Sequence, residues 1–389
     1  MTLCDVPEQP DGVQLSQPPD LPEGVPPLRS FYLYLSASCN LRCRHCWITP
    51  EYAGTKPLPG QTIDLEALRQ GIAEGKTLGL TSAKLTGGEP MLHPRFMDIV
   101  DMLSKEGISL NMETNGTLLT PENARYLKEH TNVGFISVSI DSPVEKEHDE
   151  FRGVKGAFKK VLYGLDCLVG AGYTNAQVIM SVHKGNRHQI ADLVKLAADH
   201  KAASVKLNPV THTGRGIAMH ERGESLDYDG NLELMRYVNE ELRPNAPIPI
   251  VLSTPPALTP FTEIWRTKGK SNDCGVIGIL GILGTGQIAL CGIGQTIPEL
   301  VYGTLGKDSI REIWINNPLI HNLRHDLEQH HDYPGICGSC IHARSCRTGC
   351  VAHNYTHGGK LVIPNWLCEE AYQRNEFPQS RLRQQSSRA

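Results

Sequence analysis

Between about residue 30 and residue 215, the pattern of apolar and polar positions alternates between two periodicities. Short, mostly apolar segments typical of buried strands alternate with longer segments whose apolar residues recur every three or four positions, as on one face of a helix. Strands are expected at residues 31–35, 83–86, 108–113, 135–140, 177–182 and 204–207, and helices at 64–72, 94–106, from 120 onward, 155–171 and 188–200. Repeated strand–helix units predict a parallel sheet with right-handed crossovers. Their number suits an α/β fold, an open, partial (β/α)6 barrel of the TIM type, with ligand-binding groups at the carboxyl ends of the strands.

Changes in composition divide the chain into further segments. Residues 1–29 contain seven prolines and are expected to form an extended arm, because proline disfavours helices and central strands. The barrel should occupy residues 30–220, followed by a connecting segment, 221–273, with a helix near 228–242. Residues 274–375 hold seven of the twelve cysteines and should form a cysteine-rich C-terminal domain. Residues 376–389 are expected to be a disordered tail.

Charge and hydropathy argue against several classes of protein. The chain has 38 Lys and Arg against 42 Asp and Glu, a net charge of −4, whereas a nucleic-acid-binding protein would favour a basic face. The sequence has no run of about 18 apolar residues, so no membrane span is expected. No signal peptide is expected either, because the N-terminus lacks its charged and apolar regions. Cysteines grouped at metal-ligand spacings without an export signal indicate a reducing, cytoplasmic environment.

Three cysteines, Cys39, Cys43 and Cys46, follow the first predicted strand at C-x3-C-x2-C spacing. Three thiolates this close together can hold three irons of a cubane iron–sulfur cluster and leave the fourth iron open to chemistry. A structural zinc site would need four ligands, and no suitably spaced fourth ligand completes this loop. His45 lies between two of the cysteines and is expected to point away from the metal. A zinc knuckle or buried free thiols remain the alternatives at this point.

A second motif, Gly87-Gly88-Glu89-Pro90, ends the next predicted strand. Two glycines let backbone groups approach a ligand closely, and Glu89 offers an acceptor for an ammonium group. With the three cysteines about 40 residues upstream, the chain resembles the radical S-adenosylmethionine (SAM) enzymes. This resemblance implies a [4Fe–4S] cluster on the three cysteines, SAM chelated to its fourth iron, and the SAM amino group on the G-G-E-P stretch. One departure is His45, where the family usually has Tyr or Phe, although an imidazole can also pack on adenine.

Polar residues near the ends of later strands extend the expected SAM site. Asn115 follows the strand at 108–113, Ser139 ends the strand at 135–140, and Arg152 lies further along the chain. Each alone is more often a cap, a turn or a solvated charge. The resemblance implies that Asn115 and Ser139 lie near the SAM ribose or carboxylate. It also makes Arg152 a candidate partner of the SAM carboxylate, a pairing that suits guanidinium geometry.

A second array of seven cysteines occupies the C-terminal part: Cys274, Cys291, Cys337, Cys340, Cys346, Cys350 and Cys368. A zinc ribbon is the alternative, since C-x2-C is common in zinc sites. The spacing resembles the SPASM extension of radical SAM enzymes that mature peptides, proteins and peptide-derived cofactors. That resemblance implies two auxiliary [4Fe–4S] clusters. The outer one would lie on Cys337, Cys340, Cys346 and Cys368, and the inner one on Cys274, Cys291 and Cys350, with its fourth ligand unassigned.

The resemblance also implies the reaction: reductive cleavage of SAM to a 5′-deoxyadenosyl radical that abstracts hydrogen from a substrate. We expect a ribosomally synthesised peptide or a protein as substrate, with an oxidative outcome such as a cross-link, thioether, dehydrogenation or decarboxylation. A flavodoxin or ferredoxin is the expected electron donor. The alternatives are an enzyme of haem-type or quinone cofactor synthesis and, from another class, a zinc-stabilised binding protein without turnover. Cys167, on an apolar helical stretch, is expected to be a core thiol, the alternative being a hydrogen-atom donor as in some peptide-epimerising relatives.

Overall fold

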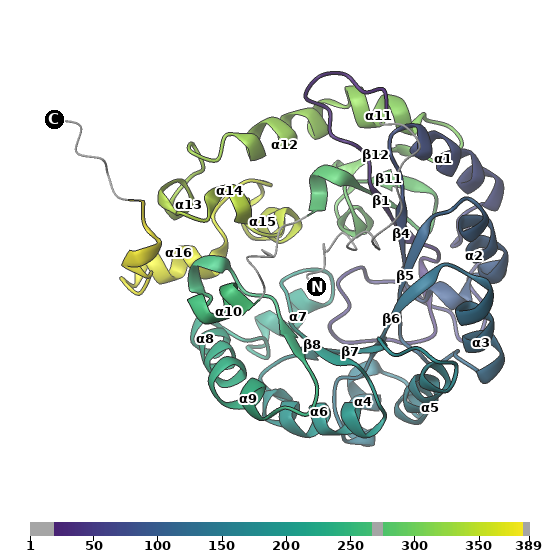
Figure 1. The fold of residues 1–389 in the computed structure, drawn as a ribbon, viewed down its shortest axis with the longest axis horizontal. Helices are drawn as coiled ribbons and strands as arrows, with labels where there is room; N and C mark the ends of the chain where they lie inside the picture. Colours follow the sequence, from purple (N-terminus) through teal and green to yellow (C-terminus); the bar gives the residue numbers. More distant parts are fainter. Residues whose placement is uncertain (1–18, 267–274, 384–389) are drawn as a thin grey trace.

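A computed structural model of the chain describes residues 19–266 and 275–383. Its centre is a sheet of ten strands in the order β12-β11-β10-β1-β4-β5-β6-β7-β8-β9. The six strands expected from the sequence are all parallel: β1 (Ser30–Tyr34), β4 (Ser82–Thr86), β5 (Ser109–Thr114), β6 (Val133–Ser139), β7 (Gln177–Val182) and β8 (Ser204–Pro209). They form an open arc with helices on its outer side (Figure 1), which confirms the predicted partial barrel.

Four strands that were not expected in the barrel extend this sheet at its two edges. At one edge, β9 (Ile250–Leu252) pairs parallel to β8, and at the other β10 (Ile279–Ile282) pairs parallel to β1. Beyond β10, β11 (Gln287–Ala289) and β12 (Val301–Thr304) follow in antiparallel order. The boundary expected at residue 274 therefore falls between strands of one continuous sheet.

The helices outside the arc are α1 (Leu65–Thr77), α2 (Phe96–Lys105), α3 (Pro121–His130), α4 (Glu145–Arg152), α5 (Ala157–Gly170) and α6 (Ile190–Asp199). Local chemistry sets where they begin. The Asp64 carboxylate accepts a hydrogen bond from the Ala67 N–H at the start of α1. Thr120 and Asn123 form a capping box at the start of α3, where Pro121 occupies the first turn.

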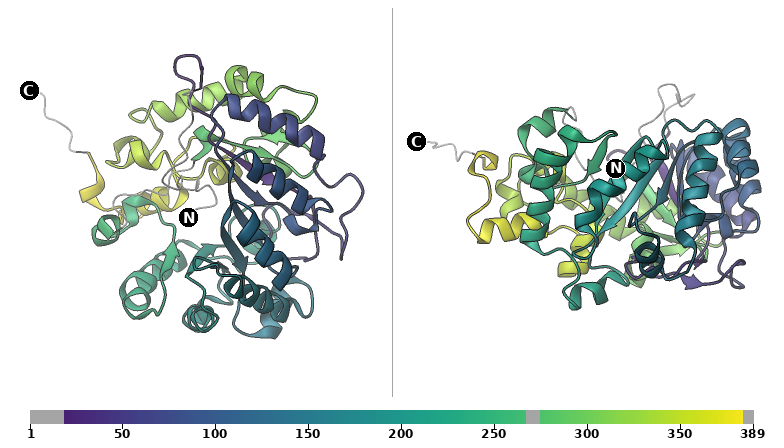
Figure 2. Two further views of the ribbon diagram at one scale, coloured as in Figure 1. Left: turned by 45° about the vertical axis from the view of Figure 1, so that its right-hand side comes forward. Right: turned by 90° about the horizontal axis from the view of Figure 1, so that it is seen from below.

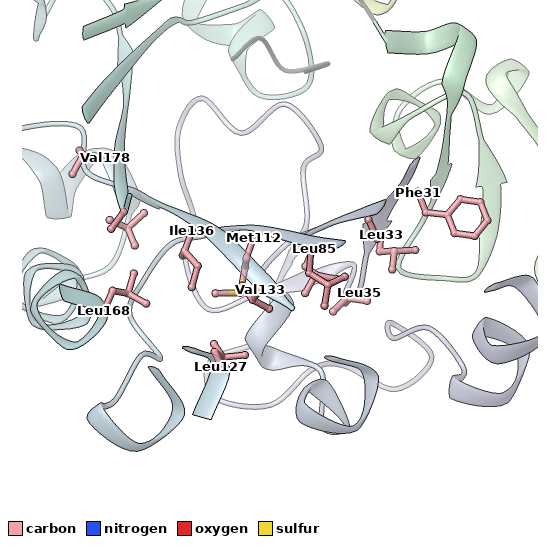
Figure 3. Close-up of a cluster of buried hydrophobic side chains, with 14 of the residues drawn as sticks. Phe31, Leu33, Leu35, Leu85, Met112, Leu127, Val133, Ile136, Leu168 and Val178 are labelled. Atoms are coloured by element: carbon pink, nitrogen blue, oxygen red, sulfur yellow. The ribbon is translucent and has the colours of Figure 1, made fainter. Parts of the chain in front are cut away.

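Apolar side chains between the sheet and these helices form a continuous core (Figure 3). Leu33, Leu85 and Met112, on β1, β4 and β5, are completely buried, and Leu127 of α3 and Leu168 of α5 belong to the same cluster. Burying one such side chain contributes about 1.5–3 kcal/mol. This packing fixes the carboxyl ends of the strands, where polar side chains can then be held in place.

The C-terminal helices lie on the side that the arc leaves open (Figures 1 and 2). They are α12 (Pro318–Glu328), α13 (Ile336–Ser339), α14 (Ala343–Cys346), α15 (Val351–Gly358) and α16 (Trp366–Gln373), while α11 (Ile310–Asn316) packs near α1. The connecting segment supplies α8 (Tyr228–Arg236), which continues as a π-helix to Leu242, and α10 (Phe261–Arg266). Residues 376–383, expected in a disordered tail, instead pack here, because Phe377 is buried among the C-terminal apolar side chains.

Candidate active site

The cysteine loop, residues 39–46, carries the first three cysteines and runs against the carboxyl end of β4. The Gly88 N–H donates to the carbonyl O of Ser36 at 2.7 Å, and the Glu89 N–H donates to that of Ser38 at 3.1 Å. A Cβ atom on Gly88 would lie 2.0 Å from the Ser38 carbonyl O. Because Gly88 has no side chain, the segment after β4 can lie directly against the backbone that precedes the cysteine loop.

The other side of the cysteine loop is held by α4 and by Arg215. Two N–H groups of the loop donate to the carbonyls of Phe151 and Arg152, at 3.0 and 2.9 Å. The Arg215 guanidinium, at the start of α7 (Gly216–Glu221), donates to the Cys43 carbonyl O at 3.0 Å. Because the loop makes these contacts through its backbone groups, they hold it in place without engaging its thiols.

Arg152 and Asp141 form a buried ion pair beside the thiols. The same guanidinium donates from Nη1 to Cys43 Sγ at 3.6 Å. Burial raises the pKa of Cys43 to about 11, and the positive charge of Arg152 opposes that rise. Soft thiolate donors are what iron–sulfur clusters require. Three thiols on one loop, one of them facing a guanidinium that favours the thiolate, fit the predicted cluster.

A cavity of about 170 Å³ opens beside the loop at the carboxyl ends of the strands. We call it the thiol cavity, because all three thiols line it. Of the residues predicted to contact SAM, Gly87, Gly88, Ser139 and Arg152 lie in its wall. Lys206 of β8 also lines it and was not predicted. A lysine between Val205 and Leu207 of a predicted strand was the available sign of a buried charge.

Glu89 and Asn115 lie behind the thiol cavity rather than in its wall. The buried Glu89 carboxylate accepts hydrogen bonds from Thr114 Oγ1 at 2.7 Å and from the Asn115 N–H at 2.9 Å, which ties β4 to β5. Burial raises the pKa of Glu89 to about 7. Asn115 Nδ2 lies 3.8 Å from Cys39 Sγ. The Asn115 side chain therefore supports the cysteine loop, whereas Glu89 braces the strand ends, and the contacts of both with SAM, like that of Pro90, remain predictions.

His45 packs against aromatic rings behind the loop. Its ring stacks on Phe151 with centroids 4.5 Å apart, and Phe151 stacks in turn on His183 at 4.7 Å. Burial lowers the pKa of His45 to about 3, so the ring is neutral. Since His45 also lines the thiol cavity, its predicted packing on adenine would use ring surface that Phe151 leaves uncovered.

A larger cavity, of about 420 Å³, lies between the barrel and the C-terminal helices. We call it the histidine cavity, because its wall includes His212, His220, His353 and His357. Residues 208–211, at and just beyond the end of β8, line both cavities. Cys346 and Cys350 line the histidine cavity on its other side. This arrangement, which the sequence did not predict, places the histidine cavity between the cysteine loop and the second array.

The second cysteine array is partly assembled in the described residues. The four cysteines assigned to the outer cluster together line a cavity of about 20 Å³: Cys337, Cys340, Cys346 and Cys368. Burial raises the pKa of the Cys291 thiol, and the negative charge of the nearby Cys350 thiolate raises it further. Cys274 lies outside the described residues. Within the described ranges, no three His, Cys, Asp or Glu side chains form a group that could hold a single metal ion.

Cys167 is buried in the core between the sheet and α5 and lines neither the thiol cavity nor the histidine cavity. Burial raises the pKa of its thiol, as expected in a core. The structure therefore does not bring Cys167 to the site. A role as hydrogen-atom donor has no geometric support.

All ten cysteines in the described part of the chain are free thiols. Free thiols at metal-ligand spacing agree with cluster ligation better than with a disulfide framework. Of the helices in residues 19–266 and 275–383, none is long and apolar enough to cross a bilayer.

Comparison with known proteins agrees with this geometry. The family model of the radical SAM superfamily matches residues 33–197. An AdoMet-dependent heme synthase from Methanosarcina barkeri is 30% identical over 87% of this chain and 94% of its own length, and a mycofactocin maturase, MftC, from Mycobacterium ulcerans is 26% identical over 87% of both. The crystal structure of Streptococcus suis SuiB bound to precursor peptide SuiA has the same fold, with a TM-score of 0.65 and 16% identity over 89% of this chain and 76% of that one. The chain belongs to the radical SAM superfamily of enzymes.

Proposed function

We propose that this enzyme oxidatively modifies a ribosomally synthesised peptide or a protein side chain. The observation that carries the proposal is the shared wall at residues 208–211, because a substrate in the histidine cavity would lie directly beside the thiol cavity. The second array flanks the same substrate space through Cys346 and Cys350. A maturase among the relatives and a neighbour in structure with a bound precursor peptide support a peptide substrate.

The roles at the first site follow from membership of the superfamily, which implies a [4Fe–4S] cluster and SAM. The cluster would be held by Cys39, Cys43 and Cys46, and SAM by Gly87, Gly88, Glu89, Pro90, Asn115, Ser139 and Arg152. When bound, these groups supply a carbon-centred radical that can take hydrogen from an unactivated position. The protein contributes orientation: Arg152 stabilises the thiolate of Cys43, Glu89 braces the strand ends, and the barrel wall excludes water.

The second array would hold two auxiliary [4Fe–4S] clusters, as in the SPASM extension. The outer set is Cys337, Cys340, Cys346 and Cys368, and the inner set is Cys274, Cys291 and Cys350. An auxiliary cluster beside the substrate could accept an electron from it and so make the reaction oxidative. A flavodoxin or ferredoxin would supply the first electron, and we place the enzyme in the cytoplasm, where thiols remain reduced.

Co-expression with the short open reading frames that neighbour the gene tests this proposal. Mass spectrometry of the recovered peptides should show the loss of two hydrogens, and the loss should depend on the cysteine loop. A variant with all three loop cysteines changed to alanine is the matched control. Unmodified peptides from cells that contain cluster-loaded enzyme would count against a peptide substrate.

A second candidate is a step in haem-type cofactor synthesis, because the heme synthase relative is matched over 94% of its length. One observation argues against it. Arg374 is the one arginine or lysine among the described residues that line the histidine cavity, and its guanidinium already pairs with Glu370 at 2.7 Å and with Asp229 at 3.2 Å. A haem precursor with several carboxylates would favour more cations. Incubation with an iron porphyrin that carries carboxyethyl groups, followed by analysis for CO₂ loss, would decide between the two.

A further inference from the structure

Three imidazoles form a connected group in the wall of the histidine cavity. His212, in the segment after β8, contacts His220 of α7 with ring centroids 3.2 Å apart and His357 of α15 with centroids 4.7 Å apart. His212 is half-buried, whereas His220 and His357 are exposed. Thr211, which directly precedes His212 in the chain, lines both the thiol cavity and the histidine cavity. The group therefore leads from the junction of the two cavities to solvent.

Oxidative coupling of a substrate requires a place for a proton. When R–H and X–H become R–X with SAM as the oxidant, one hydrogen leaves as an atom, which joins the 5′ carbon of SAM and forms 5′-deoxyadenosine. The other leaves as a proton and an electron, and the auxiliary clusters that the second array would hold would accept the electron. In balance, SAM, R–H and X–H give methionine, 5′-deoxyadenosine, R–X and H⁺, and the electron released replaces the one used to cleave SAM. Dehydrogenation also releases a proton, whereas oxidative decarboxylation releases CO₂ and none.

We infer that His212 accepts this proton and that His220 and His357 pass it to solvent. The inference rests on the proposed function and narrows it to reactions that release a proton, coupling or dehydrogenation. A positioned base of this kind contributes about 10²–10⁴-fold to a rate. Oxidation of the substrate makes the departing proton strongly acidic, so even a weakly basic imidazole can accept it.

The two carboxylates among the described residues of the cavity wall are already engaged. The Asp227 carboxylate pairs with Lys184 Nζ at 2.8 Å, and the Glu370 carboxylate pairs with Arg374 at 2.7 Å. Burial and the neighbouring imidazoles of His220, His357 and His353 lower the pKa of His212 to about 4. Near neutral pH its ring is therefore unprotonated, which a proton acceptor must be.

The test compares wild type with His212→Gln in co-expression with the candidate peptides. Oxidised peptide formed per 5′-deoxyadenosine should fall about 100-fold in the variant. His325→Gln, an exposed histidine on α12, is the matched control and should keep the wild-type ratio. His212→Ala supplied with free imidazole should regain part of the lost ratio, which a purely structural role would not allow. His357→Gln, at an exposed position with little risk to folding, should show a smaller loss.

Each result bears on a different claim. An undiminished ratio in His212→Gln, with oxidised peptide from wild type, would overturn the proton acceptor and leave the proposed function standing. If the wild-type enzyme forms no oxidised peptide, or if it releases CO₂ from a porphyrin, both the proton acceptor and the proposed function would be overturned. A readout independent of turnover is the titration of histidine Cε1 resonances in the labelled enzyme. The His212 resonance is identified by its absence from His212→Gln, and it should remain that of a neutral ring down to about pH 5. Titration near the ordinary value of 6.5 would contradict the arrangement of the three imidazoles.

Discussion

Replacing Gly88 by alanine should disable the site while the barrel stays folded. The new Cβ atom would lie 2.0 Å from the carbonyl O of Ser38 and 3.0 Å from Pro50 Cβ, whereas ordinary contacts begin at 3.4 Å. The end of β4 and the cysteine loop would therefore have to separate by about 1 Å or more. Ser38 directly precedes Cys39, so the shift falls on a predicted cluster ligand. A displacement of about 1 Å costs about 100-fold in rate, equivalent to about 3 kcal/mol of transition-state stabilisation.

The assay is anaerobic formation of 5′-deoxyadenosine from SAM and dithionite, with iron content and circular dichroism measured on the same samples. Gly170→Ala is the matched control, since its Cβ would have no atom within 4 Å. We expect Gly170→Ala to retain the wild-type rate. Gly88→Ala at the wild-type rate, with full iron content, would refute the argument that this contact positions the cysteine loop.

Three further predictions concern the same site. Changing all three loop cysteines to alanine should remove about four irons per chain and abolish 5′-deoxyadenosine formation; SAM cleavage that persists would reject the ligand assignment. Asp141→Asn should leave the buried Arg152 charge without its carboxylate and lower the free energy of unfolding by about 3–5 kcal/mol, measured by urea denaturation of the iron-free protein. Burial lowers the pKa of His148 from 6.5 to about 4. As the pH falls, His148 is therefore protonated in the unfolded chain before it is protonated in the folded one. The contribution of His148 to the free energy of unfolding should be complete above pH 6.5 and fall by about 3 kcal/mol towards pH 4. This fall should be smaller in His148→Asn.

The elements of the barrel were predictable where periodicity and capping agree. The strand expected at 177–182 is β7, and the helix expected from Thr120 begins there because the cap and Pro121 act together. α4 was missed because its sequence, Glu145–Arg152, is mostly charged and shows no apolar stripe. Phe151 and Arg152, two of its buried residues, pack against the cysteine loop rather than in the apolar core, so helical periodicity could not show them.

The outer strands were not predictable from local pattern. β9 and β10 are only three and four residues long, and their pairing with β8 and β1 joins segments far apart in the sequence. At the site, motif spacing placed Gly87, Glu89 and Asn115 at the right strand ends. It could not show which way each side chain points, since that depends on contacts across strands. Glu89 and Asn115 consequently face the neighbouring backbone and thiol instead of the thiol cavity.

The added strands explain how the second array reaches the first site. After the β10–β11 hairpin the chain returns past the cysteine loop, where a Cβ atom on Gly292 would lie 2.2 Å from Tyr34 Oη and 2.5 Å from the Trp47 ring. Gly292 directly follows Cys291, so backbone packing against the barrel, rather than a flexible linker, sets the distance from this predicted inner ligand to the loop. Under the proposed function, electron transfer from a substrate in the histidine cavity to an auxiliary cluster would depend on such a fixed distance. The merging of the C-terminal strands with the barrel sheet is therefore part of how the site would work, because a separate, hinged domain would leave that distance free to vary.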